Sequence, residues 1–132
     1  MNKYSNFKIL IVDDNHDNLY TLRQLIEKHM DARVLEADSG KRAIEIALEN
    51  PDIDLIVLDI QMPEMDGYEA TREIRRRPEY ADLPIIAMTA NALQGDREAC
   101  LAAGMDDYIS KPVQQALLQQ AVQKWTADQE QN

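Results

Sequence analysis

Ile9-Leu10-Ile11-Val12 is a run of four apolar residues that ends directly in Asp13 and Asp14. The same arrangement recurs where the run Leu55-Ile56-Val57-Leu58 ends in Asp59. Continuous apolar runs of this length are typical of parallel strands that are buried on both faces of a sheet. The carboxyl ends of such strands all lie at one edge of the sheet, where ligands bind. We therefore expect these carboxylates to meet in one crevice.

Two further strand ends carry polar residues of a different kind. The apolar run over residues 84–88 ends in Thr89, and Lys111 follows the short run over residues 108–110. If these strands belong to the same sheet, a hydroxyl and an ammonium group join the carboxylates at its edge. Each residue alone is most often structural, since polar residues at strand ends commonly form turns or caps. Their joint arrangement on the strand ends favours a functional site.

The segments between these runs have helical patterns. We expect strands over residues 8–13, 32–37, 54–59, 84–89 and 108–110, with the second at an edge because its alternation is weaker. A helix should follow each strand, and the third should extend over residues 66–77. The last helix is expected to begin at Pro112 and to bury Val113, Leu117, Ala121 and Trp125 on one face. This alternation predicts an α/β fold, a doubly wound five-stranded parallel sheet with five helices in a three-layer sandwich.

The length of the chain suits one domain. The chain has 132 residues, and we expect a single domain over residues 1–132, with its core at about 7–126 and a polar C-terminal tail. The formal net charge of -10 argues against a nucleic-acid partner. No signal-peptide pattern precedes the first strand and no apolar run reaches membrane-spanning length, so we expect no membrane partner and a cytoplasmic location. The single cysteine, Cys100, suits a reducing compartment.

The grouped acids indicate a divalent cation. Carboxylates a few ångströms apart repel one another, and burial raises the free energy of each charge. Oxygen ligands suit magnesium (Mg²⁺) better than zinc, and no Cys and His residues stand at zinc spacing. The ammonium of Lys111 and the hydroxyl of Thr89 would then face a bound anion, and a phosphoryl group fits such donors. A carboxylate can accept it as the nucleophile. Asp59 is the best candidate, because the adjacent pair Asp13 and Asp14 suits metal binding.

Several motifs together resemble the receiver domain of two-component response regulators over nearly the whole chain. They are Asp13-Asp14, Asp59 with Met62-Pro63 and Asp66-Gly67, Thr89-Ala90, and Gly104-Met105-Asp106-Asp107-Tyr108 before Lys111-Pro112. The chain resembles in particular the receivers of hybrid histidine kinases. The residues that carry this resemblance are Asp14-Asn15 with Asn18, and Asp59-Ile60-Gln61-Met62-Pro63. The resemblance implies a flavodoxin-like fold with strand order 2-1-3-4-5. It also implies a signalling domain that takes part in its own phosphorylation and dephosphorylation, and not an enzyme.

The resemblance implies roles for the residues at the first and third strand ends. Asp59 would accept a phosphoryl group from a histidine of a kinase or of a histidine phosphotransfer protein. Asp13, Asp14 and Asp59 would hold Mg²⁺ together with the backbone carbonyl of Gln61. Gln61 lies two residues beyond the acceptor, so its side chain should overhang the phosphoryl group and influence attack by water.

The resemblance also implies a switch at the fourth and fifth strand ends. A phosphoryl group adds nearly two negative charges, and Thr89 and Lys111 can contract toward it. Tyr108 would move between exposed and buried rotamers as Thr89 moves, although from the residues alone it can equally be a strand aromatic with its hydroxyl in water. The affected surface would include the fourth helix, fifth strand and fifth helix, and would bind a downstream protein target. Lys124 is the only basic residue of the glutamine-rich last helix, so we expect a monomer rather than a charge-paired dimer.

Three other functions compete with this one. An aspartate-nucleophile phosphatase of the haloacid-dehalogenase type needs a second acid two residues after the nucleophile, where Gln61 stands. A flavodoxin-like cofactor binder needs Gly, Ser or Thr donors in the first loop, where residues 13–17 are acidic. In a phosphate-independent interaction module, the acid pair, Thr89 and Lys111 would have no reason to coexist. The sequence does not decide whether the domain is free-standing or part of a larger chain.

Overall fold

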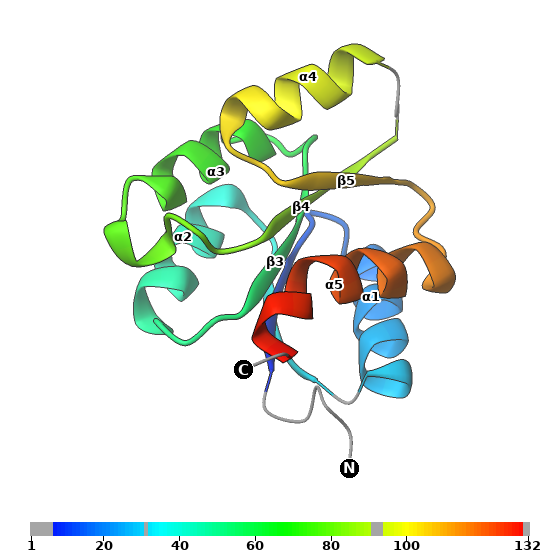
Figure 1. Cartoon of the computed structure of the whole chain (residues 1–132). Coiled ribbons are helices and arrows are strands. Elements are labelled where there is room, and N and C mark those ends of the chain that lie inside the picture. Colours follow the sequence, from blue (N-terminus) through cyan, green and yellow to red (C-terminus); the bar gives the residue numbers. More distant parts are fainter. Residues whose placement is uncertain (1–6, 31, 91–93, 131–132) are drawn as a thin grey trace.

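The computed structural model describes residues 7–30, 32–90 and 94–130 of the 132-residue chain. Within these ranges, five parallel strands form one sheet in the order β2-β1-β3-β4-β5 and alternate with five α-helices (Figure 1). The strands are β1 (Lys8–Val12), β2 (Arg33–Ala37), β3 (Leu55–Asp59), β4 (Ile85–Thr89) and β5 (Asp107–Ser110). The helices are α1 (His16–His29), α2 (Gly40–Glu49), α3 (Gly67–Arg75), α4 (Gln94–Ala103) and α5 (Gln115–Glu130). The predicted fold class and strand order are confirmed, with β2 at an edge.

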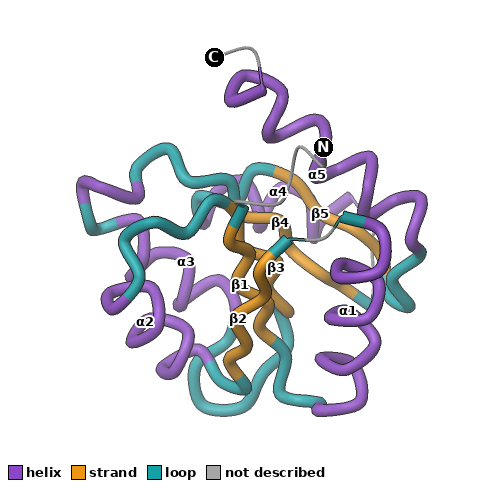
Figure 2. The backbone as a smooth tube through the Cα atoms, turned by 90° about the horizontal axis from the view of Figure 1, so that it is seen from below, coloured by secondary structure: helices purple, strands orange, loops and turns teal. Residues whose placement is uncertain are grey.

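The helices cover both faces of the sheet and make three layers. Alternate residues of β1 show the division, because Ile9 and Ile11 pack with α1 and α5 whereas Leu10 and Val12 pack with α2, α3 and α4. Figure 1 shows α2 and α3 on one side of the strands and α1 with α5 on the other, and Figure 2 shows the strands between the layers from below. These four residues are fully buried, which explains why the strand is apolar throughout.

The first helix is capped by Asn15. The side chain of Asn15 accepts a hydrogen bond from the backbone N–H of Asn18 at 3.0 Å. A side-chain oxygen at this position satisfies one of the N–H groups that the first helical turn leaves without a partner. Leu19, Leu22 and Ile26 follow at helical spacing and are buried. The cap and the buried face together fix where α1 begins, directly beside the end of β1.

The third helix is shorter than expected, and the prediction that it extends to residue 77 is wrong. It ends at Arg75, and a 3₁₀ helix, η1, follows at Pro78–Tyr80. The physical reason is Pro78, because a proline ring disfavours helical dihedrals in the residue before it. Arg77 accordingly has an extended backbone, with φ -88° and ψ 124°.

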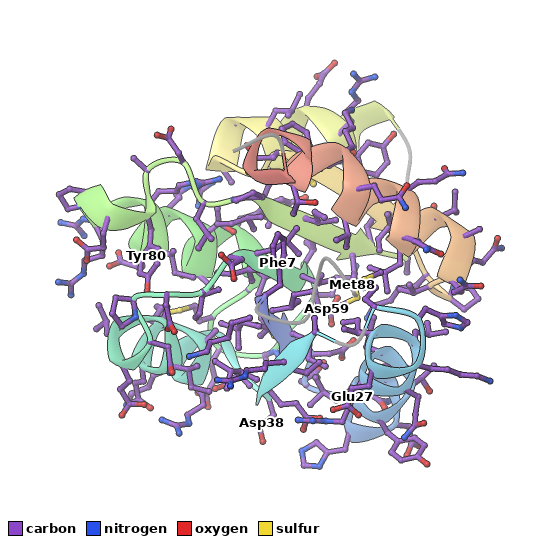
Figure 3. All side chains as sticks on the ribbon, turned by 60° about the horizontal axis from the view of Figure 1, so that its bottom comes forward. Phe7, Glu27, Asp38, Asp59, Tyr80 and Met88 are labelled. Carbon is purple, nitrogen blue, oxygen red and sulfur yellow. The ribbon has the colours of Figure 1, made fainter. Side chains whose placement is uncertain are left out.

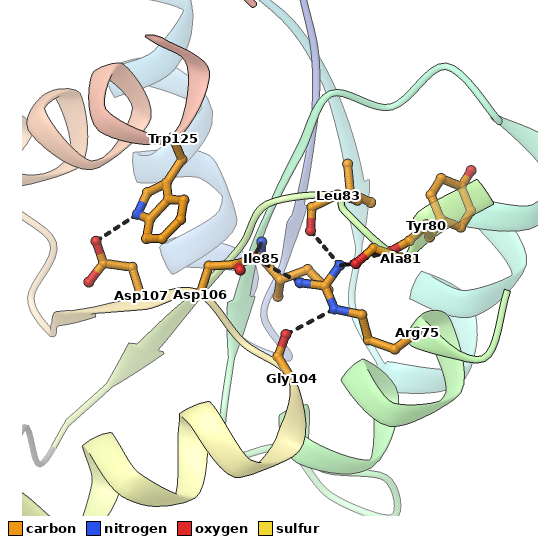
Figure 4. Close-up of polar contacts among 9 residues, drawn as sticks. All are labelled: Arg75, Tyr80, Ala81, Leu83, Ile85, Gly104, Asp106, Asp107 and Trp125. Carbon is orange, nitrogen blue, oxygen red and sulfur yellow. Dashed lines mark hydrogen bonds and ion pairs between the residues drawn. The ribbon is translucent and has the colours of Figure 1, made fainter. Parts of the chain in front are cut away.

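Arg75 joins the end of α3 to the amino edge of the sheet (Figure 4). Its guanidinium donates to the carbonyls of Tyr80 at 2.8 Å, Leu83 at 2.6 Å and Gly104 at 2.9 Å. A charge-assisted hydrogen bond of 2.8 Å joins it to the carboxylate of Asp106. These contacts fix the segments that enter β4 and β5. They lie at the opposite edge of the sheet from the strand ends that carry the acids.

The last helix begins later than expected. It starts at Gln115, so the prediction that Pro112 opens it is wrong. The N–H of Lys111 donates to the carbonyl of Thr89 at 2.8 Å, which continues the sheet ladder past the end of β5. The chain therefore stays at the sheet edge through Lys111 before it turns into α5.

The buried face of α5 also differs from the prediction. Leu118 and Val122 are fully buried, whereas Leu117, which the spacing places toward the core, is 42% exposed. Adjacent residues of a helix point in different directions, and here Leu118 rather than Leu117 faces the core. Ala121 is buried as predicted. Trp125 is half-buried, and its indole N–H donates to the carboxylate of Asp107 at 2.8 Å (Figure 4).

Candidate functional site

Three carboxylates meet at the carboxyl edge of the sheet. β1 and β3 are neighbours, so Asp13 and Asp59 lie at adjacent strand ends. One carboxylate oxygen from each of Asp13, Asp14 and Asp59 lies within 4.8 Å of the others. Asp13 and Asp59 are buried, and Asp14 is exposed. Figure 3 shows Asp59 in the middle of the fold beside Met88, its neighbour on β4.

The ammonium of Lys111 lies between two of these carboxylates. Its Nζ is 3.1 Å from Oδ2 of Asp13 and 3.0 Å from Oδ1 of Asp59. The backbone N–H of Gln61 donates to the same Oδ1 of Asp59 at 3.2 Å. The side chain of Lys111 is 23% exposed, so both ion pairs form in a largely buried place. The fifth strand end thus reaches across β4 to the first and third strand ends.

The charges of the site do not balance. Burial raises the pKa of the Asp59 carboxyl, the hydrogen bond to Lys111 opposes this, and the charge of Asp13 adds to it, so the net shift is upward. Burial opposes the charge of Lys111, but its hydrogen bonds to Asp59 and Asp13 prevail and raise its pKa. Lys111 therefore stays charged at neutral pH. Within this cluster, its single positive charge lies beside three carboxylates. Such an excess of negative charge attracts a cation.

Thr89 and Tyr108 lie on β4 and β5, at strand positions whose side chains face the opposite side of the sheet from the acids and Lys111. Thr89 is buried at the last position of β4, and Tyr108 is half-buried on β5. Tyr108 packs against the core cluster of α2, α3 and α4, whereas Met88, directly before Thr89, belongs to the cluster of α1 and α5. Successive residues of a strand face opposite sides, so Thr89 belongs with Tyr108. The structure brings Lys111 and the acids together, and it places Thr89 and Tyr108 toward the other face.

The donor set of the site fits magnesium. Mg²⁺ binds oxygen ligands at about 2.0–2.1 Å, so two ligands on opposite sides of the ion lie about 4.2 Å apart. The oxygens of Asp13, Asp14 and Asp59 lie within 4.8 Å of one another, which is close to that span. Asp14 is exposed, so its side chain is free to adjust to an ion. Carboxylates that leave the other positions to water are the usual magnesium pattern in proteins.

Comparison with known proteins decides the family. The family model described as the response regulator receiver domain matches residues 9–123. The chain belongs to this family. As a receiver domain it is a phosphoacceptor signalling module of two-component systems, and the predicted resemblance is confirmed.

Relatives of this receiver domain include parts of sensor kinases. It is 42% identical to the sensor histidine kinase GacS of Pseudomonas protegens over 122 residues, which are 90% of this chain and 13% of GacS. The chain therefore spans only a small part of the length of such a relative.

Two solved structures share the fold closely. The receiver domain of the sensor histidine kinase PA1611 from Pseudomonas aeruginosa, with a magnesium ion coordinated in its active-site cleft, is 43% identical with a TM-score of 0.84, and the match covers 92% of this chain and 98% of that one. The co-crystal structure of the Saccharomyces cerevisiae histidine phosphotransfer protein Ypd1 with the receiver domain of Ssk1 matches at 31% identity and a TM-score of 0.85, covering 94% and 91% of the two chains.

Gly67 of this receiver domain shapes the site, although the sequence motifs predicted no role for it beyond the resemblance. A Cβ atom on Gly67 would lie 2.5 Å from the carbonyl oxygen of Asp59 and 2.8 Å from Cα of Ile60. The N–H of Gly67 also donates to the carbonyl of Ile60 at 2.8 Å. The sequence feature that could have revealed this role is a glycine directly after the helix cap Asp66, a position where helix geometry alone does not require glycine. The start of α3 therefore packs directly on the backbone that carries Asp59.

Gly67→Ala should destabilise the domain and displace Asp59. Forcing extra volume into a packed place costs about 1–3 kcal/mol, and we expect the upper end because the contacted atoms are backbone. Chemical denaturation measures the loss. Phosphate uptake from acetyl phosphate, measured at a temperature where the variant stays folded, should also fall.

Gly104→Ala is the matched control. Gly104 has φ 104°, a backbone conformation that costs other residues about 1–3 kcal/mol, but it lies before β5 at the opposite edge. This variant should lose stability and keep the wild-type rate of phosphate uptake. Equal loss of phosphate uptake in both variants would show that Gly67 acts only through global stability.

Proposed function

We propose that Asp59 accepts a phosphoryl group from the phosphohistidine of a histidine kinase or of a histidine phosphotransfer protein. An oxygen of Asp59 would form the new O–P bond, and the P–N bond would break with its electron pair going to the imidazole nitrogen. The observation that carries the proposal is the buried carboxylate of Asp59, with the ammonium of Lys111 at 3.0 Å and two further carboxylates beside it. This combination places positive charge and metal ligands around one nucleophilic oxygen group.

The proposed phosphoryl donor agrees with the proteins in which, or with which, related domains are found. A relative of this chain is a sensor histidine kinase, and a receiver domain of similar structure was crystallised with a histidine phosphotransfer protein. In the described part of the chain, none of the helices has the length and apolar character needed to cross a bilayer. The cytoplasmic location, the monomeric state and the single domain over residues 1–132 stay predictions.

Magnesium is the proposed cofactor. Asp13, Asp14 and Asp59 would hold it together with the backbone carbonyl of Gln61, and it would supply the positive charge that phosphoryl oxygens need. The imbalance of charge at the site supports this role. The magnesium ion in the active-site cleft of the PA1611 receiver domain supports it as well.

Phosphorylation would change the protein-binding surface through Thr89, Lys111 and Tyr108. Lys111 would pair with the phosphoryl oxygens, and Thr89 would turn toward them from the other face of the sheet. Tyr108 borders a hollow of about 500 Å³ between α4, β5 and α5. Leu101 and Leu117, which are 52% and 42% exposed, line the same hollow. We assign the contact with a downstream protein target to this surface, because a shift of Tyr108 changes its shape.

Receiver domains are signalling modules, and we propose that this one takes part in its own phosphorylation and dephosphorylation. Gln61 is exposed, while its backbone N–H donates to Asp59 within the site. A side chain that covers the phosphoryl group would limit the approach of water. The competing phosphatase of the haloacid-dehalogenase type needs a general acid at this position, which an amide does not supply.

Gln61→Ala is expected to shorten the lifetime of the phosphorylated protein severalfold without preventing phosphorylation. The N–H that contacts Asp59 belongs to the backbone and is retained in the variant. Loss of phosphate followed by mass spectrometry after removal of the donor measures the lifetime. Gln123→Ala, an exposed glutamine on α5, is the control and should decay like the wild type. An unchanged lifetime for Gln61→Ala would remove the shielding role.

Incubation with acetyl phosphate, with and without Mg²⁺, tests the proposed function. We expect one labile phosphate per chain in the presence of Mg²⁺ and little in its absence. Repeated turnover of unrelated phosphate esters would favour the phosphatase instead. A protein that takes up no phosphate under either condition would favour the phosphate-independent interaction module.

A further inference from the structure

The carboxylate of Asp13 is held at both oxygens. Oδ1 accepts the backbone N–H of Asn15 at 2.9 Å, and Oδ2 accepts the side-chain amide of Asn18 at 3.2 Å. The ammonium of Lys111 contacts the same Oδ2 at 3.1 Å. Asp13 is fully buried, so a turn of its carboxylate would leave a buried oxygen without a donor, which is unfavourable. Asp13 therefore has one preferred orientation in the absence of any cation.

The cap of α1 fixes these donors in turn. The side-chain oxygen of Asn15 accepts the backbone N–H of Asn18 at 3.0 Å, and the side-chain amide of Asn18 donates back to Asp13. The hydrogen bonds run in a closed circuit through Asp13, Asn15 and Asn18. Within this circuit, Asn15 reaches Asp13 through its backbone and Asn18 reaches it through its side chain. The contact from Asn18 can therefore be removed without altering the backbone of the loop.

We propose that Asn18 is a positioning residue, which sets the affinity for Mg²⁺ and the place of Lys111 by orienting Asp13. The proposal rests on the metal role proposed above for Asp13. Because Oδ2 is shared between the amide of Asn18 and the ammonium, Lys111 remains between Asp13 and Asp59. Without the amide, Asp13 turns toward Lys111 and loses the orientation that favours a metal ion. Hydrogen-bond partners behind metal ligands typically change metal affinity by about 10–100-fold.

The surroundings of Asn18 permit a test by substitution. Asn18 is exposed on α1, and it borders a cavity of about 190 Å³ that is also lined by Asp13, Lys111, Met88 and Val113. Leucine removes the amide donor and can lie against Met88 and Val113, which are among the apolar residues of this cavity. Glutamine keeps an amide donor on a longer side chain. Gln24→Leu removes an exposed amide elsewhere on the same helix and is the matched control.

The experiment measures Mg²⁺ binding to the unphosphorylated protein by isothermal titration calorimetry. Asn18→Leu should bind Mg²⁺ about tenfold more weakly than the wild type, at the lower end of the known range for such partners. Asn18→Gln should recover part of the affinity, and Gln24→Leu should match the wild type. With acetyl phosphate as donor, Asn18→Leu should need correspondingly more Mg²⁺ for half-maximal uptake of phosphate.

Two results would overturn the proposal. The first is Mg²⁺ affinity in Asn18→Leu equal to that of Gln24→Leu. The second is a lower unfolding midpoint in EDTA with unchanged Mg²⁺ affinity, which would show that Asn18 only stabilises α1. A wild-type protein that binds Mg²⁺ but takes up no phosphate would overturn the proposed function instead, and weaker Mg²⁺ binding by Asn18→Leu would still support the role of Asn18.

Discussion

Asp59→Asn is expected to abolish the uptake of phosphate from acetyl phosphate and to leave the fold intact. The amide keeps the size of the side chain, and its oxygen can still accept the hydrogen bonds that Asp59 receives from Lys111 and from the N–H of Gln61. It lacks the charged oxygen that attacks phosphorus. With Mg²⁺ present, mass spectrometry of the intact protein should show one labile phosphate on the wild type and none on the variant.

Asp54→Asn is the matched control. Asp54 lies directly before the same strand, β3, at the opposite edge of the sheet. Its carboxylate accepts the N–H of Lys8 at 2.8 Å, and burial raises its pKa as it does at Asp59. The control should take up phosphate like the wild type. A labile phosphate on the Asp59→Asn protein would move the acceptor to another carboxylate.

Asp59→Asn and Asp54→Asn also test how the stability of the folded protein depends on pH. The pKa of each carboxyl is raised above its ordinary value of 3.8, so the folded protein binds these protons more tightly than the unfolded chain. The stability that this binding contributes is fully present below pH 3.8 and is lost as the pH rises through the folded pKa. An amide does not titrate, so each Asn variant should gain stability relative to the wild type over that window and keep the gain at neutral pH. Urea unfolding in metal-free buffer measures it, and a gain independent of pH would contradict the assignment.

Lys111→Met should have the largest effect on stability. Removing one partner of a buried ion pair typically costs about 3–5 kcal/mol, because the remaining charge is buried without compensation. Lys111 compensates both Asp13 and Asp59, and its raised pKa keeps it charged over the whole neutral range. We expect a loss of about 3 kcal/mol in EDTA, at the lower end because the side chain of Lys111 is still 23% exposed. Urea unfolding measures this loss.

Magnesium should restore part of the stability of Lys111→Met. A ligand that binds only the folded protein stabilises it more as its affinity rises, and the variant lacks the ammonium that competes for the carboxylates. The stabilisation by Mg²⁺ should therefore be larger than in the wild type, while phosphate uptake at saturating Mg²⁺ should fall. Lys8→Met, at an ion pair with the exposed Asp52, is the control and should lose less than about 1 kcal/mol. A Lys111→Met protein as stable as this control would contradict the buried ion pairs.

Helix ends were harder to predict than strands. Each strand lies within one residue of its expected bounds at either end. For β1, β3 and β4 the reason is that a buried parallel strand is apolar until it reaches the sheet edge. The C-terminal end of α3 and the start of α5 were wrong for other reasons. Pro78 ends α3 early because it holds Arg77 in an extended conformation, and Lys111 stays bonded to Thr89 on the neighbouring strand. The proline is visible in the sequence, whereas the contact of Lys111 has no local signature there.

The sequence by itself determined the alternation of strands and helices and the position of each polar residue at a strand end. It could do so because burial on both faces leaves a strand no place for a charge except at its ends. Only the tertiary structure decided which of these residues touch. Lys111 reaches Asp13 and Asp59, Thr89 starts on the other face, and Asn18 holds Asp13, since such contacts depend on distances of about 3 Å between segments that are remote in sequence.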